Sequence, residues 1–457
     1  MEPPDARFRD LAHEAPEASK RGRQYDPSVQ KYVLSELDSG QRVVTERLTH
    51  VRSVALGFWI GAGSRDERDE RAGVSHFIEH LLFKGTQRYT AQEIAEVFDA
   101  MGGELNAATA REHTVVYARV ADHHLDEAID VMSDMVYAPL FTEVDSEREV
   151  VLEEIAMYED QPQELVHDLI AEAVFGHHPL GRPVIGTAEV ISSVSRRSIT
   201  AYHRSMYVPG NVVVAAAGNL DHNELLGLLE GAESKVGEAP ARGRRVRSPL
   251  VKPPPPDLRF MRKDTEQYHL CLAAPGIARS DRRRFAASLL DAILGGSASS
   301  RLFQEIREKR GMAYSVYTYG SQYAETGQVG IYVGTREDNL RECLDVTAAE
   351  LADVSAGNLR PGELERAKEN LEGRLLLSLE STSNRMTRLG RALVTDTELV
   401  PTEETIRRIR RVTEDDIAAV SSELFAPARL SAAGIGPRES RFRSAVARMN
   451  PALAERS

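Results

Sequence analysis

The chain carries one series of sequence marks twice, in the same order in its two halves. Three segments are echoed: 125–131 by 340–346, 147–154 by 365–372, and 199–217 by 417–434. The first pair has apolar residues at helical spacing. The second has a Glu-Arg pair and a further Glu seven residues after the first, and the third has an aromatic residue and a proline before an apolar strand. Repetition in a fixed order is typical of an internal duplication, so we expect two units of one architecture.

The length of the chain agrees with two units, because 457 residues exceed what one hydrophobic core usually serves. A Pro- and Arg-rich stretch near the middle is typical of a stiff linker. The predicted organisation has five parts: a flexible N-terminal arm at 1–25, a first domain at 26–235, the linker at 236–257, a homologous second domain at 258–440, and a tail at 441–457.

Short apolar runs at 53–60 and 114–120 predict strands, and they lie among longer segments with a period of 3.6 residues. The runs 31–34 and 41–44 flank Gly40 and predict an antiparallel hairpin. No Gly-x-Gly-x-x-Gly motif follows a strand, which also argues against a doubly wound nucleotide-binding fold. We therefore expect an α+β fold in which two homologous α/β units have mostly antiparallel sheets and packed helices.

The segment 71–83 has apolar residues at helical spacing, with Ser75 as a candidate cap and Gly85 as a stop. His76, Glu79 and His80 are related by i, i+3 and i+4, so their side chains project from one helix face. Two neutral imidazoles one turn apart can bind the same Zn²⁺ at about 2.0–2.1 Å, while a nearby carboxylate accepts a proton from water. The order His-x-x-Glu-His is that of the inverted zincins, so the segment predicts a catalytic zinc site.

A catalytic zinc needs a third protein ligand and an open position, and a carboxylate from a second helix is the usual complement to two histidines. The segment 147–154 offers Glu147, Glu149, Glu153 and Glu154. Glu147 and Glu154 are seven residues apart and share a helix face. Spacing alone does not rank the four glutamates as ligands.

The other polar clusters have simpler interpretations. The acidic and basic residues at 65–71 are most simply a solvated loop. The remaining histidine clusters lie outside the ligand spacing and are expected to be ordinary surface or core residues; they are His113, His123-His124 and His177-His178.

Composition narrows the class of protein. Cys271 and Cys343 are the only cysteines, too few for a disulfide framework, and a reducing cytoplasm is the expected compartment. The net charge of −13 disfavours general nucleic-acid binding. No stretch approaches about 18 uncharged apolar residues and residues 1–25 lack a signal-peptide pattern, so neither a membrane span nor a targeting segment is expected.

Several motifs occur in an order that identifies a family. They are Gly57-Phe-Trp-Ile-Gly61, Gly63-Ser-Arg65, His76-Phe-Ile-Glu-His80, Leu82-Phe-Lys-Gly-Thr86, Gly102-Gly-Glu-Leu-Asn-Ala-Ala-Thr109 with Glu112 and Tyr117, the segment 147–154, and the segment 300–314. With these motifs the chain resembles, over nearly its whole length, the pitrilysin or insulinase-type zinc metallopeptidases (peptidase M16), including the mitochondrial processing peptidase beta subunit and bacterial homologues.

The resemblance implies roles for particular residues. His76, His80 and Glu154 would bind one Zn²⁺ per chain, and Glu79 would be the general base that activates a zinc-bound water. Glu147 would support catalysis from beside the ligands, as metal sites generally require. The domain at 26–235 would then be the metal-binding catalytic domain.

The resemblance also implies substrate-binding residues. An extended peptide would add to an edge strand near Asn106 and Ala107, an arrangement in which main-chain hydrogen bonds carry the affinity and sequence tolerance is broad. Arg307 and Tyr314 of the second domain would hold the substrate carbonyl and stabilise the developing oxyanion. Both could serve the metal site of the same chain.

The expected function is that of a zinc endopeptidase acting on unfolded peptides or short polypeptides in a bacterial cytoplasm. The family implies four homologous units around a chamber, so this chain would be half of a clamshell and would form a homodimer or a heterodimer with a homologous chain. The alternative is a non-catalytic scaffold or substrate-presenting subunit of a peptidase complex. Because His76, Glu79, His80 and Glu154 are all present, the catalytic interpretation is preferred.

Overall fold

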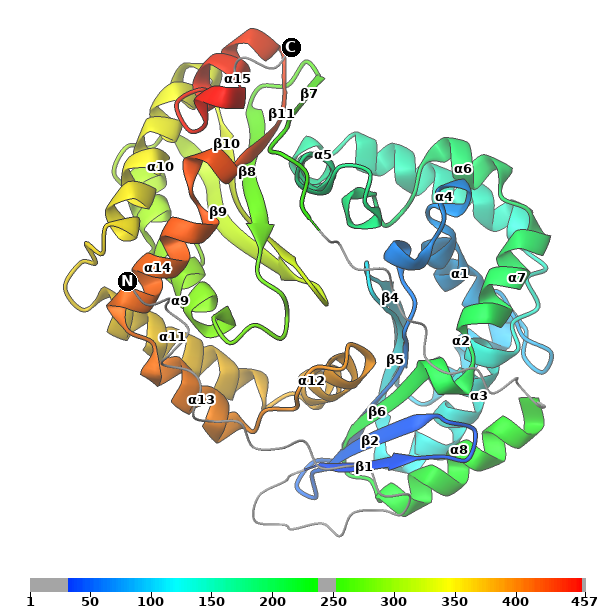
Figure 1. Ribbon diagram of the computed structural model, residues 1–457. Helices are drawn as coiled ribbons and strands as arrows, with labels where there is room; N and C mark the ends of the chain where they lie inside the picture. The colour runs from blue at the N-terminus through cyan, green and yellow to red at the C-terminus, as the bar shows by residue number, and fades with distance from the viewer. Residues whose placement is uncertain (1–31, 237–251, 454–457) are drawn as a thin grey trace.

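The computed structural model describes residues 32–236 and 252–453, and these form two halves that face each other in Figure 1. The arm predicted at 1–25 and most of the linker predicted at 236–257 lie outside the described residues. Among the described residues, no helix combines the length and the apolar character needed to cross a membrane.

The sheet of the first half has strand order β1-β2-β6-β3-β5-β4. Its strands are β1 (Val33–Glu36), β2 (Arg42–Arg47), β3 (Ser53–Ile60), β4 (Glu104–Thr109), β5 (Thr114–Ala121) and β6 (Val212–Gly218). Neighbouring strands are antiparallel except β2 and β6. The predicted hairpin is β1–β2, and Gly40 takes a φ of 83° in its turn, which favours glycine. β4 lies at the edge of the sheet.

The sheet of the second half repeats this topology, and within residues 252–453 it has no counterpart of β1. Its order is β7-β11-β8-β10-β9, and β7 and β11 are its parallel pair. The strands are β7 (Leu258–Arg262), β8 (Tyr268–Gly276), β9 (Ala313–Gln322), β10 (Gly327–Thr335) and β11 (Ser431–Gly436). The prediction of two homologous α/β units with mostly antiparallel sheets is therefore confirmed.

Helices cover both sheets. Those of the first half are α1 (Val74–Leu82), α2 (Ala91–Ala100), α3 (Leu125–Tyr137), α4 (Val144–Glu159), α5 (Pro162–Phe175), α6 (Ala188–Ser193), α7 (Arg196–Met206) and α8 (His222–Val236). Those of the second half are α9 (Arg284–Leu294), α10 (Leu340–Ser355), α11 (Glu363–Ser378), α12 (Thr382–Val394), α13 (Thr402–Arg411), α14 (Glu414–Leu424) and α15 (Glu439–Val446), with a π-helical turn at Phe303–Glu308.

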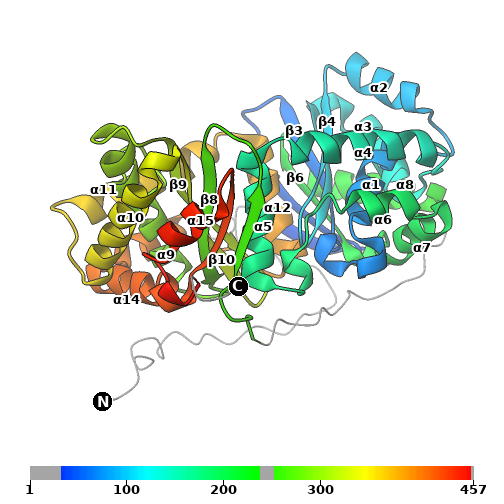
Figure 2. The same cartoon turned by 90° about the horizontal axis from the view of Figure 1, so that it is seen from above.

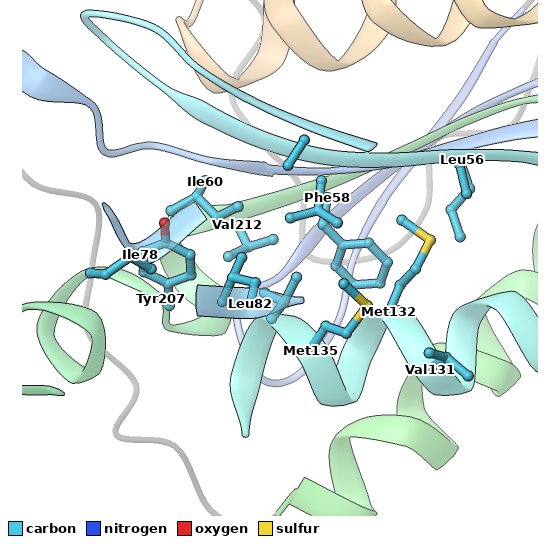
Figure 3. Close-up of a cluster of buried hydrophobic side chains, with 14 of the residues drawn as sticks. Leu56, Phe58, Ile60, Ile78, Leu82, Val131, Met132, Met135, Tyr207 and Val212 are labelled. Atoms are coloured by element: carbon cyan, nitrogen blue, oxygen red, sulfur yellow. The ribbon is translucent and has the colours of Figure 1, made fainter. Parts of the chain in front are cut away.

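One face of the first sheet packs on helices of its own half. Figure 3 shows Leu56, Phe58 and Ile60 of β3 directed towards side chains of α1 and α3, among them Leu82 and Met132. These residues are fully buried. The helix that carries the predicted metal ligands is thus held by the core of the first half.

The opposite face of each sheet is covered by a helix from the other half. Met386 and Leu389 of α12 pack on Ala55 and Val213 of the first sheet. In the same way α5 packs on the second sheet, with Ile170 among its buried contacts. Figures 1 and 2 show both helices between the two halves. The halves therefore share core surface as well as a connecting segment.

The charge run at 65–71 is only in part the solvated loop that its composition predicts, because residues 68–70 are exposed but residues 65–67 are buried. Arg65 is only 5% exposed, and Asp66 and Glu67 are buried as well. The Arg65 guanidinium pairs with Glu112 at 2.6 Å and with Glu325 of the second half. Local composition could not show this, because both carboxylate partners lie far away in the sequence.

The segment predicted as a tail at 441–457 is built into the fold as far as residue 453. It contains most of α15, and Phe442, Val446 and Leu453 are buried in the core of the second half. The second unit therefore extends beyond residue 440, since its last apolar side chains complete that core.

Candidate metal centre

Helix α1 begins after Gly73, whose φ of 95° lies in the left-handed region. The carboxylate of Glu67 accepts hydrogen bonds from the backbone N–H groups of Gly73 and Ser75, both at 2.7 Å. It thereby satisfies donors that a helix leaves free at its first turn. Ser75, the cap expected from sequence, lies inside the helix, and Tyr202 is the partner of its hydroxyl. The N-terminus of the predicted metal helix is therefore held by Glu67, in the buried part of the charge run.

The two histidines of α1 converge with one glutamate of α4. His80 Nε2 lies 3.2 Å from the Glu154 carboxylate, and His76 Nε2 lies 3.7 Å from it. One donor atom from each of the three residues falls within 4.8 Å of the others, and no other such group occurs among the described residues. Ligands bonded to a tetrahedral zinc at about 2.0–2.1 Å are separated by roughly 3.4 Å, so this spacing suits the ion.

The other glutamates of α4 occupy different places. Glu147 Oε1 lies 3.0 Å from His80 Nδ1, and its second oxygen pairs with Lys84 Nζ at 2.7 Å. A hydrogen on Nδ1 directed at this carboxylate leaves the lone pair of Nε2 for a metal. Glu149 and Glu153 are exposed and belong to no such group. The structure thus separates four glutamates that spacing could not rank.

The electrostatics of the site also suit a metal ion. Burial, with a smaller effect from His80, lowers the pKa of His76 to about 4. His76 is therefore neutral near pH 7 and can act as a ligand. Two imidazoles and one carboxylate make a donor set that fits Zn²⁺.

Glu79 lies on the same helix face but outside the group of three donors. Its Oε2 accepts a hydrogen bond of 2.5 Å from the hydroxyl of Thr109, the last residue of β4. Burial raises the pKa of Glu79, while the bond from Thr109 opposes that rise. A carboxylate with a raised pKa holds a proton better near neutrality, as a general base requires. No role was assigned to Thr109 from sequence, since only the fold brings β4 to α1.

The metal group opens onto a cavity of about 410 Å³ between the two halves. The first half contributes His76, Arg111, Glu154, Tyr158, His167, Asp168, Val184 and Ile185, and the second half contributes Tyr319, Ser321 and Gln328. Arg111 and Asp168 form an ion pair at 3.4 Å within this wall. Neither residue is predicted from sequence, because the two come from separate elements and share no motif spacing.

The predicted substrate-binding residues fall in two places. Asn106 and Ala107 lie on β4, which among the described residues pairs along one side only, with β5. In the second half, the guanidinium of Arg307 lies 4.7 Å from the ring centre of Tyr314, whose side chain is largely exposed.

Neither Arg307 nor Tyr314 lines the cavity beside the metal group. The residues of β9 that do so are Tyr319 and Ser321, whereas Tyr314 lies near the opposite end of that strand. A role of both residues at the metal site of the same chain gains no support from this cavity and stays a prediction. Motif spacing could not show this, because it carries no information on which end of β9 faces the first half.

A duplicated α+β scaffold with His-x-x-Glu-His on one helix and a converging glutamate on a later helix defines the inverted-zincin class of metallopeptidases. Residues 42–188 match the family model described as Insulinase (Peptidase family M16). Residues 193–371 match the model described as Peptidase M16 inactive domain. The chain belongs to this insulinase family, peptidase family M16.

Two bacterial relatives, matched over most of their own length, carry names that agree with this family. An uncharacterized zinc protease of Streptomyces coelicolor is 42% identical over 426 residues, covering 90% of this chain and 92% of the relative. The uncharacterized zinc protease YmxG of Bacillus subtilis is 40% identical over 390 residues, covering 85% and 94%. A protease from Helicobacter pylori has the same fold, with a TM-score of 0.83 at 21% identity, covering 89% of this chain and all of that one.

Proposed function

We propose that the chain is a zinc-dependent endopeptidase that hydrolyses peptide bonds of unfolded peptides or short polypeptides. One observation carries the proposal: His76, His80 and Glu154 bring three donor atoms within 4.8 Å of one another at the wall of a cavity. Glu79 stands beside them on α1 with a half-buried carboxylate. The names of the bacterial relatives, zinc proteases, support the same activity.

The chemistry divides between the ion and the chain. Bound Zn²⁺ would polarise the scissile carbonyl and lower the pKa of water. Glu79 accepts the proton of the attacking water on its carboxylate and passes it to the leaving nitrogen. Glu147 and Lys84 keep His80 oriented by holding its Nδ1 side.

The substrate would lie along β4. Because its outer edge is unpaired among the described residues, an extended peptide can add to it through main-chain hydrogen bonds near Asn106 and Ala107. Only an unfolded segment can supply such a strand. This favours peptides and short polypeptides over folded proteins.

Arg307 and Tyr314 would act in an assembly of two chains. Tyr314 lies near the end of β9 away from the cavity-lining residues of its own chain, and Arg307 stacks on its ring, which supports a role for both at the metal site of a second, homologous chain. There they would hold the substrate carbonyl and its developing negative charge. A homodimer or a heterodimer would satisfy this arrangement, and a bacterial cytoplasm is the proposed location.

The test is hydrolysis of a quenched-fluorescent library of unstructured peptides by the purified chain, with bound zinc quantified. The wild type is expected to bind one zinc and to cleave, and a chelator to stop it. Glu79→Gln should keep the zinc and lose turnover. Asp291→Asn, a change to a half-buried carboxylate of α9 in the second half, is the matched control and should retain turnover.

The outcomes separate the candidate functions. Zinc binding without cleavage by the chain, alone or mixed with a homologous chain, would contradict the peptidase and favour the scaffold or substrate-presenting subunit. Absence of zinc binding would contradict the metal site itself.

A further inference from the structure

The contact between Thr109 and Glu79 occurs a second time in the molecule. In the second half the hydroxyl of Thr318 donates to the carboxylate of Asp291 at 2.6 Å, against 2.5 Å for Thr109 and Glu79. Both carboxylates are on helices and both threonines are on strands at a sheet edge, β4 and β9.

The two contacts occupy equivalent positions of the duplicated units. Glu79 lies three residues before the last residue of α1, and Asp291 three residues before the last residue of α9. Thr109 follows by seven residues Gly102, whose φ is 60°, and Thr318 follows by seven residues Gly311, whose φ is 62°. Because both the glycine turn and the spacing along helix and strand are the same, we infer that the two contacts are equivalent in the duplicated units.

The two histidine ligands, in contrast, are not repeated. The positions three before and one after the carboxylate are His76 and His80 in the first half but Ser288 and Ala292 in the second. The hydroxyl–carboxylate bond is thus present where two histidines are missing. It therefore belongs to the duplicated scaffold, in which it ties a helix to the edge strand, rather than being a consequence of metal binding.

We propose that Thr109 is a positioning residue for Glu79, and that it uses this scaffold bond to hold Oε2 so that Oε1 is left to accept a proton. The inference rests on the proposed function. A glutamate side chain has three rotatable bonds, and fixing one oxygen from the neighbouring strand removes much of that freedom before substrate arrives. Thr109 also lies on the strand proposed to receive the peptide, so the base is fixed relative to the substrate backbone.

The experiment compares zinc-loaded full-length wild type with Thr109→Val, Thr109→Ser and Thr318→Val. Thr109→Val is expected to lower kcat about 10- to 100-fold while zinc content stays at the wild-type level and KM changes less than about threefold. Thr109→Ser, which restores a hydroxyl, should recover most of kcat. Thr318→Val should lower the unfolding temperature as Thr109→Val does but leave kcat within about twofold.

Other results would overturn the inference. They are an unchanged kcat in Thr109→Val, loss of zinc together with activity in that variant, or an equal loss of kcat in Thr318→Val. A second readout separates this inference from the proposed function. Crystal structures of zinc-loaded wild type and Thr109→Val should show the Glu79 carboxylate displaced in the variant, and an unchanged carboxylate would contradict the role of Thr109 even if the wild type cleaved no peptide.

Discussion

At the scale of single residues, the two ring nitrogens of His80 have different neighbours. Nε2 faces Glu154, while Nδ1 faces Glu147, which Lys84 holds from its other oxygen. Because Glu147 is buried, water does not compete with its carboxylate for the hydrogen bond to His80 Nδ1, and the imidazole stays oriented. Partners of this kind fix the tautomer of a ligand histidine and its basicity.

Glu147→Gln is therefore expected to weaken zinc binding about 10- to 100-fold, because the amide carries no charge to support His80. Competition with a chelator of known affinity measures the change. Glu365→Gln is the control, since Glu365 is the counterpart on α11, is exposed, and pairs with Lys368 of its own helix. Equal zinc affinity in Glu147→Gln and wild type would contradict the supporting role.

Glu67 links stability to pH. Burial raises its pKa to about 7, against the hydrogen bonds from Gly73 and Ser75, which lower it. The folded protein therefore binds this proton more tightly than the unfolded chain does. The stability gained from the protonated Glu67 is complete below pH 4.5 and is lost as the pH rises through 7.

We expect the free energy of unfolding of the metal-free wild type, relative to Glu67→Gln, to fall by about 3 kcal/mol between pH 4.5 and 8. Chemical denaturation of both proteins in a chelator measures the difference at each pH. A difference that does not vary with pH would show that Glu67 does not titrate in this range.

At the scale of elements, helix α12 approaches the first sheet closely because it contains a glycine. A Cβ added to Gly390 would lie 2.0 Å from Nε1 of Trp59, on β3. The same indole donates to the sulfur of Met386 at 3.4 Å, so it cannot move freely. Glycine in a helix normally costs about 1 kcal/mol relative to alanine, and here it permits the contact between the halves.

Gly390→Ala is expected to destabilise the protein by about 1–3 kcal/mol, since overpacking at Trp59 outweighs the gain in helix propensity. Gly373→Ala on α11 is the matched control, because a Cβ there meets nothing within 4 Å. It should be neutral or stabilising by up to about 1 kcal/mol. Thermal unfolding measures the stability of both variants. Equal changes in stability would contradict the overpacking at Trp59.

At the scale of the whole molecule, each half contributes one helix to the sheet of the other: α5 packs on the second sheet and α12 packs on the first. Each sheet has one face completed by the other half, and the buried pairs of Arg65 with Glu325 and of Arg279 with Glu112 join the halves beside them. Exposed apolar sheet faces promote aggregation. The two halves should therefore be poorly stable apart.

A fragment that ends at residue 236 is expected to be insoluble or only partly folded when it is expressed alone. Co-expression with a fragment that begins at residue 252 should yield a soluble complex, because α12 then covers the first sheet. Size-exclusion chromatography and circular dichroism of the separate and co-expressed fragments test this. A stable, monomeric first fragment would contradict the dependence.

Much of this architecture follows from local sequence. The strands at 53–60 and 114–121, the hairpin around Gly40 and helix α1 agree with their apolar periodicity, since the side chains that face a core repeat with the period of the element. The duplication predicted the repeated topology, and the i, i+3, i+4 spacing predicted that His76, Glu79 and His80 share one face.

Tertiary structure decided what no local pattern contains. It selected Glu154 over its neighbours, buried Arg65 against partners from both halves, built residues 441–453 into a core, and set Arg307 with Tyr314 away from the cavity. It also joined Thr109 to Glu79 and exchanged α5 and α12. The physical reason is that periodicity reports which side of its own element a residue faces, whereas a contact between elements depends on how separate parts of the chain pack together.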